Sequence, residues 1–154
     1  MNGAIKKGLG FGLTSGIITT LGLMVGLSSS THSKSVVLSG ILIIAIADAL
    51  SDAFGMHMSE ESDAKNSQKK VWESTISTFF FKFVFALTFV VPVLIFDLNL
   101  AIIISVLWGL FAISIFSYDL AIKEKIKPYK VMFEHISIAI FVIIVTHFVG
   151  LLLG

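Results

Sequence analysis

The sequence predicts an all-α integral membrane protein that crosses the bilayer five times. Of its 154 residues, 56% are hydrophobic and 14% are charged, whereas about a quarter of the residues in a soluble domain are charged. The mean hydropathy is +0.97. A single small core cannot bury so much apolar surface, so we expect lipid to cover it. Five apolar stretches each reach the roughly 20 residues that a spanning helix needs.

We expect one transmembrane domain, 1–154, in which polar or turn-forming breaks separate the five spans. Pro92 near the end of the third span predicts a kink there, because proline lacks a backbone N–H. The first apolar run loosely resembles a cleavable signal peptide. It is long enough to span, so we expect the chain to retain it. The spans are predicted at 8–29, 35–59, 73–96, 98–121 and 132–153.

The lysines predict the orientation in the membrane. All 11 basic residues are lysines. With a cytoplasmic N-terminus, nine of them lie in cytoplasmic segments and only Lys34 lies in an outer loop. Cytoplasmic loops carry an excess of lysine and arginine, so the C-terminus is predicted on the outer or luminal side. The chain shows no organelle signal, so we expect a prokaryotic plasma membrane.

Composition also argues against several function classes. The chain has no cysteine, so it has no disulfide, thiolate metal site or cysteine nucleophile. It has no Gly-rich phosphate loop and no hydrolase or zinc-protease motif, so we do not expect an enzyme or a permanently bound cofactor. A net charge of +1 gives no case for nucleic-acid binding.

The informative segment is a polar line on the second span. Asp48, Asp52, Met56 and Glu60 follow one another at a spacing of four, so on a helix they stack along one face. An aspartate at the centre of a spanning helix costs about 2.5–3.5 kcal/mol on insertion scales, and such acids are by default candidates for ion or proton pathways. Carboxylates with one thioether fit a borderline divalent ion such as Fe²⁺.

Two features leave alternatives open. The two aspartates could instead be protonated and hydrogen-bond a neighbouring helix as structural glue. Lys82 lies deep inside the third span, where it could pair with Asp48, pair with Asp52, or extend its side chain to water.

The first span is rich in small residues. Gly8, Gly12 and Gly16 recur at a spacing of four, and such a stripe lets two helices approach closely in lipid. It is consistent with a homodimer contact and equally with packing inside one subunit.

Three segments resemble the vacuolar iron transporter family. Residues 12–21 are similar to the family's Asp-Gly-Ile-Val-Thr-Thr-Phe segment, and residues 145–154 to its closing helix. The most specific match is residues 48–60, which resemble the family pattern Asn-x-x-Ala-Asp-Gly-x-Ser-Met-x-x-Gly-Glu. The resemblance covers nearly the whole chain.

The resemblance implies a five-helix homodimer with an Fe²⁺ path lined by its first two helices, and proton antiport out of the cytoplasm. Asp52, Met56 and Glu60 match family positions directly. Two positions depart: Ser15 stands where the family has an aspartate, and Asp48 stands where it has an asparagine. We interpret this as a relocated charge. The Glu-rich cytoplasmic insert that some members carry is reduced here to a short linker.

These observations predict a divalent metal transporter that exports Fe²⁺ or Mn²⁺ from the cytoplasm by proton antiport. Asp48, Asp52, Met56 and Glu60 are the expected metal ligands. The expected partners are lipid, protons, the metal ion, and a second copy of the chain that packs through the first and second helices. The alternatives are a proton-coupled carrier or channel for another small solute, and a non-transporting membrane subunit.

Overall fold

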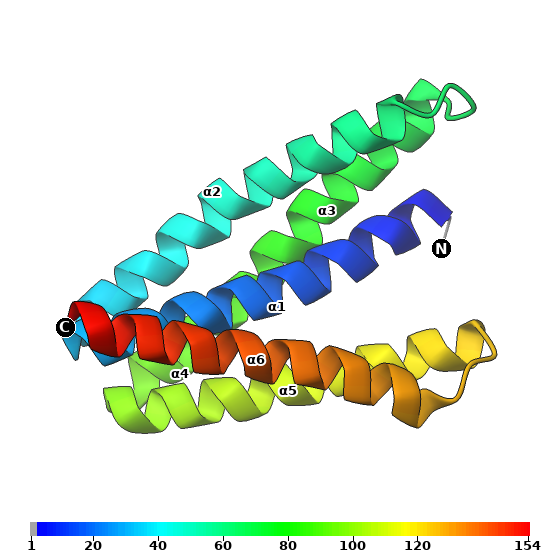
Figure 1. The fold of residues 1–154 in the computed structure, drawn as a ribbon. Coiled ribbons are helices and arrows are strands. Elements are labelled where there is room, and N and C mark those ends of the chain that lie inside the picture. Colours follow the sequence, from blue (N-terminus) through cyan, green and yellow to red (C-terminus); the bar gives the residue numbers. More distant parts are fainter. Residues whose placement is uncertain (1–2) are drawn as a thin grey trace. The chain divides into compact units, whose positions relative to one another are not determined.

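The computed structural model describes residues 3–154, which form α-helices joined by short turns and contain no strand (Figure 1). Five helical spans are long and apolar enough to cross a membrane. They confirm the five predicted apolar spans and suit a multi-pass membrane protein. The helices are α1 (Gly3–Thr31), α2 (Lys34–Glu61), α3 (Gln68–Thr88), α4 (Val90–Ile95), α5 (Leu98–Lys123) and α6 (Pro128–Leu153).

The third span is interrupted at Phe89, between α3 and α4. Pro92 has no N–H to donate to the carbonyl of Thr88, and its ring would clash with that carbonyl. The Phe89 N–H donates instead to the Ala86 carbonyl at 3.2 Å, which tightens the last turn of α3. The kink expected at Pro92 is therefore a short break in the helix.

Helix ends coincide with the polar breaks in the sequence. Ser67 caps α3, where its side chain accepts a hydrogen bond from the Lys70 N–H. Asp97 caps α5 by accepting from the Leu100 N–H. Pro128 begins α6, a position that suits proline because the first N–H groups of a helix have no partner within it. Local capping chemistry thus sets where these helices start.

The helices pack into two compact units, and two of them contribute to both. The first unit holds α1 up to Thr20, α2 from Ile41 onward, and α3. Within it, α2 and α3 run antiparallel beside each other (Figure 1). The second unit holds the remaining parts of α1 and α2 together with α4, α5 and α6. In the second unit α5 and α6 pack against each other as antiparallel neighbours.

The glycine stripe of α1 packs against α3 of the same chain. A Cβ atom at Gly12 would lie 2.7 Å from the Thr78 carbonyl oxygen and 2.9 Å from the Lys82 backbone nitrogen. On either side of Gly12 along α1, Gly8 and Gly16 also face the α3 backbone. Of the two uses that the sequence allowed for this stripe, the structure shows packing inside one subunit.

The outer surface is strongly apolar. Only 11% of the most apolar 18-residue stretch of α6 is buried within the chain. Large side chains such as Phe133, Phe141 and Leu152 are exposed. A soluble protein rarely exposes so much contiguous apolar surface. These side chains therefore suit contact with lipid.

Candidate functional site

Four polar side chains from three helices meet inside the first unit. The Lys82 ammonium of α3 contacts Asp48 Oδ2 at 2.5 Å and also forms an ion pair with Asp52, both on α2. It donates a hydrogen bond to Ser15 Oγ of α1 at 2.8 Å. Ser15 in turn donates to Asp52 Oδ2 at 2.6 Å. We call Ser15, Asp48, Asp52 and Lys82 the Lys82 cluster.

Local sequence explains why these groups meet. Asp48 and Asp52 lie one helical turn apart, so both carboxylates project from the same side of α2. A Cβ atom at Gly16 would lie 3.0 Å from the Lys82 carbonyl oxygen. The missing side chain therefore lets α1 approach α3 closely enough for Ser15 to reach the ammonium.

Burial within the Lys82 cluster is uneven. The Lys82 side chain is only 2% exposed, whereas those of Asp48 and Asp52 are 25% and 22% exposed. With all three groups ionised, the cluster carries two negative charges and one positive charge. Asp48 Oδ2 forms no hydrogen bond in the described structure, so its contact with Lys82 is an ion pair without hydrogen-bond geometry. This oxygen is itself buried, so the 25% exposure of the Asp48 side chain lies on its other atoms.

Sequence reasoning missed part of this cluster. It left Lys82 with three possible placements, and the structure shows pairing with both aspartates. A lysine deep in a spanning helix needs a counter-charge, and Asp48 and Asp52 are the acids at a matching depth, so the signal was present. Ser15 was interpreted only as the position where the family's aspartate is missing. Its hydroxyl in fact bridges Lys82 and Asp52 through hydrogen bonds.

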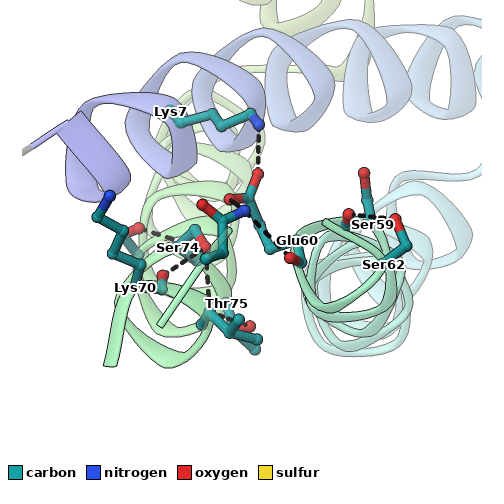
Figure 2. Close-up of polar contacts among 10 residues, drawn as sticks. Lys7, Ser59, Glu60, Ser62, Lys70, Ser74 and Thr75 are labelled. Atoms are coloured by element: carbon teal, nitrogen blue, oxygen red, sulfur yellow. Dashed lines mark hydrogen bonds and ion pairs between the residues drawn. The ribbon is translucent and has the colours of Figure 1, made fainter. Parts of the chain in front are cut away.

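Glu60 lies in a separate polar group near the end of α2. Its side chain is 8% exposed and forms an ion pair with Lys7 of α1. Figure 2 shows Lys7 reaching from α1 toward Glu60. The Asn66 side-chain amide donates to the Glu60 carbonyl oxygen and to its carboxylate, both at 3.1 Å. This buried acid is thus paired with a lysine from another helix, as Asp48 and Asp52 are.

The four predicted metal ligands therefore occupy separate levels of α2. Asp48 and Asp52 share Lys82, while Met56 is largely buried one turn further along. Glu60 is eight positions after Asp52, which is about 12 Å along a helix. One ion cannot touch both within one subunit. Within residues 3–154, no three histidine, aspartate or glutamate side chains converge as a metal-binding group.

Comparison with known proteins gives no assignment by similarity. No protein-family model matches the sequence, and no curated protein matches it significantly. The geometry of the Lys82 cluster and the sequence pattern of α2 are therefore the features that indicate a function.

Proposed function

We propose that this protein is a membrane transporter that exports a divalent metal cation, Fe²⁺ or Mn²⁺, from the cytoplasm in exchange for protons. The observation that carries the proposal is the position of two partly exposed carboxylates in the interior of a spanning helix. Asp48 is about 20 Å from either end of α2 at 1.5 Å per residue. Acids at that depth are costly unless they are paired or functional.

The chemistry of the Lys82 cluster suits a hard or borderline cation. Two carboxylates and one hydroxyl supply oxygen donors, which such cations prefer. Metal binding requires deprotonated carboxylates. Protons and metal would therefore compete for Asp48 and Asp52, and this competition is the physical basis of exchange in the proposal.

Met56 and Glu60 extend the same face of α2 toward its C-terminal end. The lysine distribution favours placing this end in the cytoplasm, with Glu60 at the entrance and Met56 on the way to the two aspartates. The proposal thus uses Asp48, Asp52, Met56 and Glu60 as successive ligands along a path. We further propose that the membrane is a prokaryotic plasma membrane.

A second copy of the chain completes the proposed path. Ser51, Gly55 and Ser59 of α2 are exposed beside the half-buried aspartates, and a Cβ atom at Gly55 would meet nothing within 4 Å. Such a polar, small-residue surface is unfavourable against lipid, whereas a facing helix can pack closely on it. A homodimer through α1 and α2 would cover it and double the number of acids. The resemblance to vacuolar iron transporters supports the same arrangement.

The proposal is tested by uptake into proteoliposomes. Fe²⁺, Mn²⁺ and Zn²⁺ fluxes are measured together with lumenal pH, for the wild type, Asp48→Asn and Asp52→Ala. The expected result is metal flux coupled to an opposite proton flux, lost in both variants while the protein still assembles. Unchanged uptake in both variants would remove the aspartates from the pathway.

One observation favours a non-transporting role as the second candidate. Lys82 neutralises part of the acidic charge, as expected if the Lys82 cluster only holds α1, α2 and α3 together. In that case metal flux is absent, while substitution of the aspartates affects assembly alone. A proton flux without metal dependence would instead favour a carrier for another small solute.

A further inference from the structure

Lys82 occupies the place that a bound cation would take. Its ammonium is surrounded by the side-chain oxygens of Asp48, Asp52 and Ser15. Three oxygens around one positive charge resemble the partial coordination shell of a metal ion that keeps some waters. We propose that the Lys82 ammonium fills the cation site when no metal ion is bound. It must move away from the two carboxylates before a transported cation binds. This inference rests on the proposed function.

Electrostatics makes the two occupants mutually exclusive. The Lys82 ammonium is buried, and unit charges a few ångströms apart interact strongly where water is scarce. A divalent cation within reach of both carboxylates would lie in contact with the ammonium and be repelled by it. Binding of the ion therefore requires displacement of Lys82, and removal of the ammonium should strengthen binding.

In this proposal the displaced ammonium moves toward Thr78 on α3 itself. Thr78 lies four residues before Lys82, on the same face of the helix. Its hydroxyl is fully buried and has no hydrogen-bond partner among residues 3–154. Long side chains on a helix lean toward its N-terminal end, which is the direction of Thr78. The hydroxyl oxygen can accept a hydrogen bond from the ammonium when Lys82 leaves the carboxylates.

Tethering also predicts selectivity for charge. The Lys82 ammonium is covalently held beside the two carboxylates, so it acts on them at a high effective concentration. A free monovalent cation such as Na⁺ therefore competes poorly with it. A divalent cation brings twice the charge to the same carboxylates and displaces it more readily. Lys82 would thus be a specificity-determining residue that favours divalent over monovalent cations.

The test is equilibrium Mn²⁺ binding to the full chain in nanodiscs at one fixed pH, with Na⁺ as competitor. Lys82→Met should bind Mn²⁺ about tenfold more tightly and should become sensitive to Na⁺. Lys82→Arg should bind Mn²⁺ about tenfold more weakly, because a guanidinium can hold a carboxylate through two hydrogen bonds. Lys69→Met is the matched control, since the Lys69 side chain is 83% exposed, and its affinity should equal that of the wild type.

Each outcome decides the inference. Mn²⁺ affinity that is equal to or weaker than wild type in Lys82→Met overturns it, as does unchanged affinity in Lys82→Arg. If Lys82→Met does not fold, Lys82→Arg decides alone, because it keeps the positive charge. Failure of the proposed function has a different signature. The wild type itself would then give no Mn²⁺ flux in proteoliposomes, whereas failure of the inference alone leaves wild-type flux intact and Mn²⁺ affinity unchanged in the Lys82 variants.

Discussion

The ammonium of Lys82 on α3 lies 2.5 Å from the carboxylate of Asp48 on α2, midway along that spanning helix. The same ammonium pairs with Asp52 one turn away. One buried positive charge thus holds two acids that would otherwise be costly in a membrane. This relationship links the stability of the first unit to its proposed chemistry, because any change at the carboxylates also changes what holds α2 against α3.

Removal of one acid from the Lys82 cluster should destabilise the protein. Asp52→Asn leaves Lys82 paired with Asp48 but weakens the hydrogen bonds that Ser15 and Lys82 donate to position 52, and a hydrogen bond to a charged group contributes about 1.5–3 kcal/mol. Lys82→Met and Asp52→Asn both delete the same ion pair, so the double variant should lose less stability than the sum of the two single losses. Unfolding in detergent, followed by helical circular dichroism, measures these differences.

An exposed pair of the same type provides the control for that cycle. Asp119 and Lys123 are four residues apart on α5, and their side chains are 54% and 55% exposed. Asp119→Asn should change stability by no more than about 0.5 kcal/mol, as exposed pairs usually do. Equal losses for Asp52→Asn and Asp119→Asn would show that the Lys82 cluster does not stabilise the fold.

The glycine stripe gives a prediction about helix packing. Gly12→Ala should destabilise the protein by about 1–3 kcal/mol, because the added methyl group overpacks the contact with the α3 backbone. In the isolated subunit, Gly55→Ala should be neutral or stabilising by up to about 1 kcal/mol, since its Cβ meets no other atom of the same chain within 4 Å and alanine favours helix. Thermal unfolding measures the change in stability of each variant relative to the wild type. A stable Gly12→Ala variant would contradict the close approach of α1 and α3.

The proposed homodimer predicts a different response at Gly55 to a large side chain. Gly55→Trp should lower the dimer fraction, because the ring would separate the facing α2 helices. Ile138→Trp, at an exposed position of α6, should leave it unchanged. Light scattering coupled to size-exclusion chromatography measures the mass of the protein in each detergent complex. Dimers of equal stability in both variants would place the contact elsewhere on the chain.

Glu60 should affect the rate of transport more than cation affinity. It lies about 12 Å along α2 from Asp52, so Glu60→Ala removes a proposed entrance ligand without touching the Lys82 cluster. We expect initial Mn²⁺ uptake to fall several-fold, while equilibrium affinity stays within about twofold of wild type. Uptake kinetics and dialysis binding separate the two quantities. A large loss of affinity would mean that Glu60 belongs to the same site as Asp52.

Hydropathy alone predicted most of the fold, because a span must be long and apolar whatever it packs against. The predicted spans lie inside the observed helices apart from the break at Phe89 and residue 96, which follows the end of α4. The polar breaks correctly predicted the helix starts at Ser67, Asp97 and Pro128. These features depend on local sequence.

Partners between helices were harder to predict, since they depend on distances that one sequence does not contain. The glycine spacing of α1 indicated a close helix contact but could not name α3 as the neighbour. Lys82 required an acid, yet nothing in the spacing showed that it would take both. The contacts of Lys7 and Asn66 with Glu60 gave no sequence signal, because both are ordinary residues at helix ends or in loops.

The central claim is that Asp48 and Asp52 bind the transported cation. The most direct test is anomalous diffraction from crystals of the wild-type protein soaked with Mn²⁺. We expect an anomalous peak within coordination distance of both carboxylates, with the Lys82 ammonium moved away from them. The claim is contradicted if protein that transports Mn²⁺ gives a peak only elsewhere, with Lys82 still seated between Asp48 and Asp52.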